Sequence, residues 1–278
     1  MLAALLALAS SLCYGSSDVI AGLQSRRRSV WSVLAVSQPA ALLVAGVLLV
    51  ARWSPARDTG PVLVALVGGI ALAAAAVLYY HALCSGTMSV VAPIASAGVL
   101  VPVLVGLASG DEVSAVQYAG MALAIAGILL SSRVEARGDG STSLGSVLLA
   151  VGSAVCFGLV MVALAAGSSE DVYSSVFALR LGATAAILVY LVVRRPRLQV
   201  TLRAVPALAA VGILGMVANL LYTAATTVGY LSVVAVLASL APVVVAVLAG
   251  VLLHERLSRA QLGAALVVLA GVVLLAAG

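Results

Sequence analysis

The chain has 278 residues, of which 64% are hydrophobic and only 8% are charged, and its mean hydropathy is +1.27. A soluble domain carries about 25% charged residues, so this composition excludes a soluble globular protein. The net charge of +5 comes from arginines scattered in short loops, which are typical of membrane-flanking anchors and give no reason to expect a nucleic-acid partner.

Apolar runs of about 20 residues, the length that crosses a bilayer, recur along the whole chain. The first run is expected to stay in the protein as a helix, because Arg26, Arg27 and Arg28 follow it and no basic residue precedes it, the reverse of a signal peptide. We therefore expect an all-α, multi-pass protein of the cell membrane, embedded in the lipid bilayer. The predicted spans are 2–24, 31–51, 61–83, 88–109, 115–132, 144–166, 173–193, 204–226, 230–252 and 260–277.

A shift of 143 residues lays the first half of the chain on the second. The segment "ASSLCYG" then falls on "GSAVCFG", which pairs Gly15 with Gly158. Further along, "GGIALAAAAVLYYHALCSGTMSVVA" falls on "VGILGMVANLLYTAATTVGYLSVVA", which pairs Gly69 with Gly212. Matches at glycine and tyrosine are informative, whereas Ala, Val and Leu matches carry little weight in this composition.

The duplication predicts a five-helix repeat over 1–132, a connecting loop over 133–143 and a second five-helix repeat over 144–278. Because five is odd, the second repeat enters the bilayer from the opposite side, so the ten helices form an inverted repeat. This architecture is typical of secondary transporters, in which two halves enclose a site near the middle of the membrane and rock around it.

Arginine placement predicts an orientation. The connections after the odd-numbered spans share one face and hold eleven arginines, whereas the other face holds only Arg52 and Arg57. By the positive-inside rule the arginine-rich face is cytoplasmic, which puts both termini outside. The eleven are Arg26, Arg27, Arg28, Arg133, Arg137, Arg194, Arg195, Arg197, Arg203, Arg256 and Arg259.

The end of the chain, "VVAVLASLAPVVVAVLAGVLLHERLSRAQLGAALVVLAGVVLL", resembles the EamA-type domain of the drug/metabolite transporter superfamily. The resemblance rests on small residues and proline in one span, an acidic residue in the loop (Glu112 and its counterpart Glu255), and a Gln…Gly helix after it. It covers essentially the whole chain as two EamA units. It implies a transporter of amino acids, sugars, nucleotide derivatives or drugs, and several relatives are described with both termini cytosolic, so the orientation stays open.

Polar residues that break the match between the halves are candidates for substrate chemistry, since matching positions serve the shared scaffold. Four such residues stand opposite a small or apolar residue in the other half. These are Asp18 opposite Met161, His81 opposite Ala224, Arg180 opposite Ser37, and Asn219 opposite Ala76.

Two of these candidates are charged groups inside spans, where they are costly unless they face a cavity or a partner. Counted along its own helix, Asp18 lies about 9 Å from the arginine-rich face and Arg180 about 20 Å, so a direct bond is not expected. An Asp18–His81 contact is the better expectation, and its functional interpretation is a proton relay. The competing interpretation, in which Asp18 caps local backbone or pairs with the arginines at 26–28 and His81 lies at the interface, stays open.

Arg180 is expected to attract an anionic substrate group or to satisfy carbonyls of a kinked neighbouring helix. Tyr79 and Tyr80, with Asn219 and Tyr222 of the second half, either line one cavity or serve helix packing. Helix kinks are predicted at Pro93, Pro102 and Pro242, where freed carbonyls can serve as ligands.

The sequence predicts no catalytic residues, metal site or cofactor, since it holds two histidines, no phosphate-binding loop and no nucleophile motif. Glu112 and Glu255 are expected to cap helix N-termini, or else to act at a gate. Helices rich in Gly and Ala fit packing within the chain or a homodimer. The predicted function is gradient-driven transport of a small metabolite, with protons as the expected coupling ion. The alternatives are a passive facilitator and a non-transporting membrane protein, either an enzyme acting on lipid-linked substrates or a scaffold.

Overall fold

The computed structural model describes residues 1–52, 59–85, 91, 94–135, 143–168 and 171–252, together with residues 263, 266, 267, 270, 271 and 274. Pro93, Glu255 and most of the predicted span 260–277 therefore lie outside the described residues. All the secondary structure within the described ranges is helical.

The first three helices follow the predicted spans closely, whereas the predicted span 88–109 is described only in part, as a 3₁₀ turn and a short helix. The helices of the first half are α1 (Leu2–Ser25), α2 (Val30–Arg52), α3 (Thr59–Ser85), the short 3₁₀ helix η1 (Ala97–Val99), α5 (Leu100–Ala108) and α6 (Ala115–Glu135). Those of the second half are α7 (Leu144–Gly167), α8 (Val172–Arg194), the 3₁₀ helix η2 (Leu202–Ala204), α9 (Val205–Thr226), α10 (Leu231–Ala238) and α11 (Ala241–Leu252). Within the described residues, six helices are long and apolar enough to cross a membrane: α1, α2, α3, α7, α8 and the continuous η2–α9 segment.

Several helix starts are fixed by side-chain caps. Asp171 accepts a 2.7 Å hydrogen bond from the Ser174 amide at the start of α8. At the start of α6, Ser114 and Gln117 bond each other's backbone amides, which is a capping box. Glu112 was predicted to cap at this point, but the capping hydrogen bonds are made by Ser114 and Gln117. The capping box takes that role because the Ser114 hydroxyl reaches the Gln117 amide directly.

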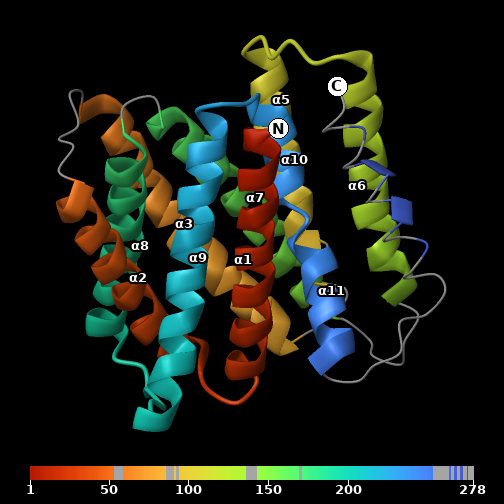
Figure 1. Ribbon diagram of the computed structural model, residues 1–278. Helices are drawn as coiled ribbons and strands as arrows, with labels where there is room; N and C mark the ends of the chain where they lie inside the picture. The colour runs from red at the N-terminus through yellow and green to blue at the C-terminus, as the bar shows by residue number, and fades with distance from the viewer. Residues whose placement is uncertain are drawn as a thin grey trace.

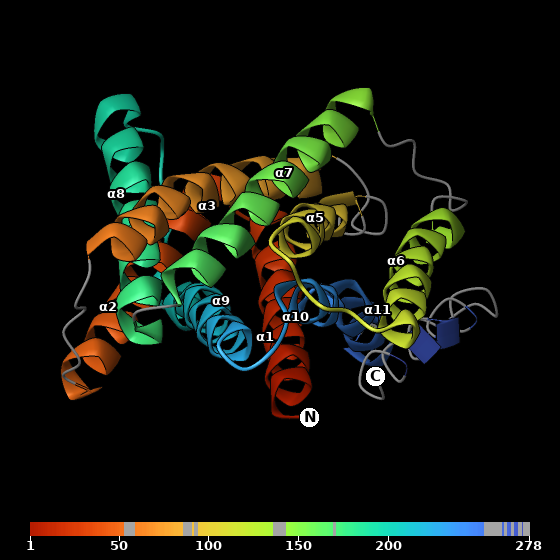
Figure 2. The ribbon, with the colours of Figure 1, turned by 90° about the horizontal axis from the view of Figure 1, so that it is seen from above.

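The two halves interleave instead of lying side by side. Helix α3 of the first half packs on α7 and α8, and α1 packs on α9 of the second half (Figure 1). Helix α2 lies against both α8 and α9. Seen from above, α1, α3, α7 and α9 cross near the centre, whereas α6 stands at the edge beyond α10 and α11 (Figure 2). Every central helix is therefore in contact with the other half.

Glycines allow the closest of these approaches. A Cβ on Gly69 of α3 would meet the Leu179 carbonyl oxygen of α8 and lie 2.7 Å from the Ala183 nitrogen. A Cβ on Gly212 of α9 would meet the Ser37 carbonyl of α2 in the same way. Both neighbours are backbone atoms, which have no freedom to turn aside. Small residues at these positions let the helix backbones touch, as is usual between membrane helices.

The outer faces carry large apolar side chains. On α2, Leu43, Val47 and Val50 are 70%, 67% and 69% exposed and recur at intervals of four and three residues, so they form one stripe along the helix. The inner face of the same helix is buried and holds Ser32, Ser37 and Gln38. This arrangement, apolar outside and partly polar inside, suits a helix bundle surrounded by lipid.

Both halves contain an interrupted helix at the same place in the repeat. In the first half, η1 inserts a 3₁₀ turn directly before α5, and Ser96 precedes that turn. In the second half, a turn at Ser239 and Leu240 separates α10 from α11. The shift of 143 residues places Ser96 on Ser239, so the two interruptions correspond. Interrupted helices at matching positions often mark the binding site of a transporter.

Candidate functional site

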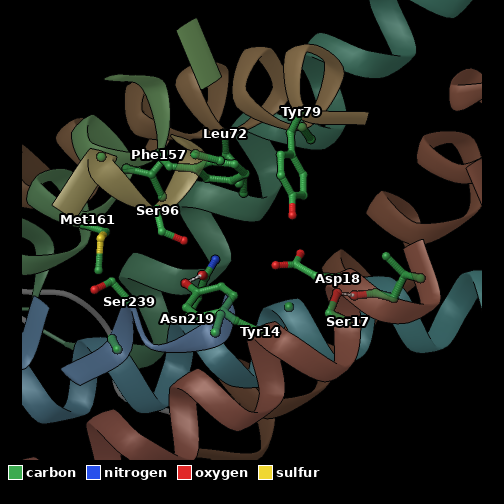
Figure 3. A pocket seen from close by; sticks show the side chains of 18 of the residues that line it. Tyr14, Ser17, Asp18, Leu72, Tyr79, Ser96, Phe157, Met161, Asn219 and Ser239 are labelled. Carbon is green, nitrogen blue, oxygen red and sulfur yellow. Dashed lines mark hydrogen bonds between the residues drawn. The ribbon is translucent and has the colours of Figure 1, made fainter. Parts of the chain in front are cut away.

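A cavity of about 140 Å³ lies where the two halves meet. Helices α1, α2 and α3 line it from the first half and α7, α8 and α9 from the second, and both helix interruptions reach it. Figure 3 shows Asp18 and Tyr79 at one end of the view, and Phe157, Met161, Ser96 and Ser239 at the other (Figure 3). Residues far apart in the sequence thus converge on one cavity.

Asp18 enters this cavity from α1. The hydroxyl of Tyr79 on α3 is directed at the Asp18 carboxylate and interacts with it. Its neighbour Ser17 is buried and donates a 2.9 Å hydrogen bond to the Val211 carbonyl of α9, which fixes this part of α1. Arg28, one of the alternative partners considered from the sequence, instead donates to the Gln199 carbonyl and to Thr201.

His81 lies elsewhere, so the expected contact between it and Asp18 is wrong for the described residues. Its Nδ1 atom forms a 2.8 Å hydrogen bond with the Val77 carbonyl, and its ring packs edge-on against Trp31. The reason is helical geometry: residues two apart on a helix point about 200° away from each other. Tyr79 faces the cavity, and His81 therefore faces α2.

Arg180 lines the cavity from α8 and is only 4% exposed. Its Nη1 atom donates to the Gln38 side-chain oxygen at 3.4 Å, a long and weak hydrogen bond. The Gln38 backbone carbonyl accepts a 3.2 Å bond from Thr184, one turn further along α8. The guanidinium group is thus held beside α2, and among the described residues most of its five N–H donors remain available.

The two charges face one cavity without touching. No ion pair joins Asp18 to Arg180 in the described part of the chain, as expected from the sequence. Their depths nevertheless differ less than predicted, because a Cβ on Gly215 would lie 3.4 Å from Arg180 Nη2 and 3.7 Å from Ser17 Oγ. Counting residues along each helix places only the Cα atoms, whereas the long side chain carries the Arg180 guanidinium group well away from its own Cα. Tyr14 and Tyr80 line the same cavity as the two charged residues.

Asn219 and Tyr222 sit one turn apart on α9. Tyr14 donates a hydrogen bond to the Asn219 side-chain oxygen across the boundary between the halves. Tyr222 is fully buried and donates at 3.2 Å to the Met161 carbonyl of α7, so its hydroxyl serves helix packing. Asn219 borders the cavity, but Tyr222 does not belong to its lining. Tyr79 and Tyr80 both line it.

Three buried polar atoms have no hydrogen-bonding partner within the described protein, and all three belong to residues that line the cavity. They are Arg180 Nε, Asn219 Nδ2 and Ser37 Oγ, in side chains that are 4%, 1% and 1% exposed. A buried donor without a partner costs about 1–3 kcal/mol, and a charged one costs more. These atoms are available to a water molecule or a ligand in the cavity.

The predicted kink positions lie near the two interruptions. Pro102 is the third residue of α5, directly after η1, and is buried. Pro242 is the second residue of α11, directly after the turn that separates α10 from α11. Because proline has no N–H, Pro242 cannot bond to the carbonyl of Ala238, which lines the cavity. Pro93 lies outside the described residues.

Sequence reasoning missed several cavity residues. Gln38 stands opposite Leu181 in the duplication, so the comparison of halves that found Arg180 would also have found it. Tyr14 stands opposite Phe157 and differs from it by one hydroxyl group, a weaker signal. Ser96 and Ser239 match each other, so the comparison of halves, which selects polar residues without a match, did not identify them. Within the described residues, no group of three or more His, Cys, Asp or Glu is placed to hold a metal ion.

Comparisons with known proteins agree with this architecture. The family model of the EamA-like transporter family matches residues 1–133 and again residues 144–277. A crystal structure of a protein with 20% sequence identity superimposes with a TM-score of 0.80, covering 98% of this chain and 95% of that chain. At this identity the likeness shows a shared fold alone. No curated protein matches the chain.

Together the two matches cover almost the whole chain. The chain belongs to the EamA-like transporter family, and it is a multi-pass membrane protein of the drug/metabolite transporter type.

Proposed function

We propose that this EamA family member moves a small metabolite across the cell membrane by alternating access, with the substrate held in the cavity between its two halves. The observation that carries the proposal is the convergence of six helices and both helix interruptions on one polar cavity. Rocking of one half against the other exposes such a site to each side of the membrane in turn.

We further propose ten helices arranged as two inverted repeats. Contacts that match under the shift of 143 residues support this arrangement. A Cβ on Gly15 would lie 2.6 Å from the Val244 Cβ, and a Cβ on Gly158 would lie 2.6 Å from the Val101 Cβ. The shift carries Gly15 to Gly158 and Val101 to Val244, so each approach is the image of the other. Parallel repeats in separate bundles would not exchange partners in this way.

The proposed driving force is a proton gradient acting through Asp18. Among the described residues it is the one carboxylate that lines the cavity, and the Tyr79 hydroxyl is directed at it. A carboxylate at a substrate site can bind a proton in one phase of the cycle and release it in another. With His81 turned toward α2, the coupling is proposed to involve Asp18 and its tyrosine neighbours in place of an Asp–His relay.

The proposed orientation follows the arginines. The segments around Arg28 and Arg197 lie together, since Ser29 donates to the Arg197 carbonyl, and Met1 lies at the opposite end of α1. The positive-inside rule assigns the arginine-rich end to the cytoplasm. The amino terminus then lies outside.

The proposal is tested by labelling two cavity positions that correspond in the two halves and measuring from which side of the membrane a reagent reaches them. Ala95 and Ala238 are 7% and 1% exposed, correspond under the shift of 143 residues, and both line the cavity. In a background without Cys13, Cys84 and Cys156, we expect Ala95→Cys and Ala238→Cys each to react with an impermeant thiol reagent added from either side of the membrane. Vesicles of known sidedness provide the measurement.

The control for that experiment is Val47→Cys on the lipid-facing side of α2, which should not react with the polar reagent from either side. Reaction of the cavity positions from one side alone would contradict alternating access. Reaction from both sides, accompanied by leakage of the reagent into the vesicle lumen, would indicate an open pore instead.

A further inference from the structure

The cavity has one anionic and one cationic wall, and we propose that it selects a small zwitterion. In the bound state the carboxylate of the ligand faces Arg180 and its ammonium group faces Asp18. The proposal names the substrate class of the transporter described above and therefore rests on that proposed function.

The cationic wall is built to receive an acceptor group. Arg180 makes one long hydrogen bond, to Gln38, and its Nε atom has no partner in the described protein. The hydroxyl of Ser37, the residue before Gln38, is buried and equally without a partner. A guanidinium group with free, directed donors favours a carboxylate or phosphate, whose oxygens accept two parallel hydrogen bonds.

The anionic wall has the opposite character. The Asp18 carboxylate offers about four acceptor sites, and among the described residues the Tyr79 hydroxyl is the side-chain donor that interacts with it. Tyr79 and Tyr80 are buried beside it, and Phe157 packs edge-on against Tyr79. A carboxylate beside buried aromatic side chains favours an ammonium group, which is attracted by its negative charge.

Charge balance favours a ligand that carries both signs. Asp18 and Arg180 form no ion pair with each other in the described part of the chain, so neither group neutralises the other. A ligand with one charge satisfies one wall and leaves a buried charge at the other, which is strongly unfavourable. A zwitterion satisfies both walls and enters with no net charge, so the cavity stays neutral.

The size of the cavity limits the ligand. Cavities of about 150 Å³ take a molecule as large as benzene, and this one measures about 140 Å³. A carboxylate and an ammonium group joined by a short carbon skeleton fit this volume. Asn219, whose Nδ2 donor has no partner in the described protein, is available for a further acceptor on the ligand.

The test uses ligands that differ in one charge. L-Alanine carries both charges, L-alaninamide lacks the carboxylate, N-acetyl-L-alanine lacks the ammonium group, and lactamide has neither. Each is added to purified Ala95→Cys protein in detergent, and the concentration that halves the rate of alkylation at that cysteine is measured. A hydrogen bond to a charged group is worth roughly 1.5–3 kcal/mol, so L-alanine should protect at a concentration at least tenfold lower than any analogue.

Two variants test which charged group of the ligand each wall of the cavity binds. Arg180→Gln should abolish the preference for L-alanine over L-alaninamide, and Asp18→Asn should abolish its preference over N-acetyl-L-alanine. Arg194→Gln, the same change at an exposed position of the same helix, should leave the protein like the parent. If either cavity variant does not fold, the ligand series on the parent protein still decides the question.

The outcomes separate this proposal from the proposed function. Equal or stronger protection by L-alaninamide or N-acetyl-L-alanine overturns the zwitterion assignment, as does absence of protection by L-alanine. In those cases labelling of Ala95→Cys from both sides of the membrane would leave alternating access intact. Labelling from one side alone contradicts the proposed function whatever the ligand series gives.

Discussion

Asp18→Asn should fold normally, bind substrate more weakly and lose gradient-driven accumulation of substrate, while exchange of substrate for substrate persists. Asparagine keeps the shape of aspartate and can still accept from Tyr79, but it cannot bind or release a proton. Exchange requires no net movement of protons, so it does not depend on the carboxylate. Uptake into proteoliposomes with and without a pH gradient, at substrate concentrations high enough to offset weaker binding, measures both activities.

The groups that face Asp18 make this substitution informative. Tyr79 interacts with it directly, and the nearby Tyr14, Tyr80 and Arg180 belong to the same cavity. Asp171→Asn is the matched control, because asparagine is as good an N-cap as aspartate and Asp171 caps α8 away from the cavity. Gradient-driven accumulation by Asp18→Asn at the parent level would make Asp18 a bystander. A variant that unfolds in detergent would give it a structural role.

Gly69→Ala and Gly212→Ala should each destabilise the protein strongly. The added Cβ at residue 69 would meet backbone atoms of α8, and the one at residue 212 would meet the Ser37 carbonyl of α2. Backbone atoms cannot rotate away, so the helices must move apart. Overpacking of this kind typically costs 1–3 kcal/mol and occasionally more, and we expect about 3 kcal/mol. The thermal midpoint in detergent is the measurement.

Gly145→Ala provides the control for this pair of substitutions. The nearest atom to a Cβ at residue 145 is the Ser143 hydroxyl oxygen at 3.7 Å, an ordinary contact. Alanine also favours the helix by up to about 1 kcal/mol over glycine, so this variant should match or exceed the parent. Equal stability of all three variants would show that the interleaved packing of the halves is wrong.

The helices were largely predictable because a bilayer permits few structures. The predicted span 2–24 became Leu2–Ser25 and 173–193 became Val172–Arg194, since length and hydropathy dominate. The break between α10 and α11 was harder to predict from the sequence. Pro242 predicted a kink there, but the separate turn at Ser239 depends on packing around the cavity.

The candidate site was predicted in part. Asp18, Arg180 and Asn219 were found because they break the internal match, and the structure brings them to one cavity. The partner of Asp18 was predicted wrongly. The prediction placed His81 by depth, but depth does not say which way a side chain points around its helix. Gln38 was missed although the same comparison of halves reveals it.

Distances between spin labels on the two faces test the central claim most directly. One pair, Ala108→Cys with Thr227→Cys, joins the halves on the face of Met1, and the other, Ser85→Cys with Leu198→Cys, joins them on the arginine-rich face; all four positions are exposed. Alternating access predicts two populations in each pair, and a shift in conditions that lengthens one distance should shorten the other. A single unchanging distance in both pairs, or pairs that lengthen together, would contradict the account.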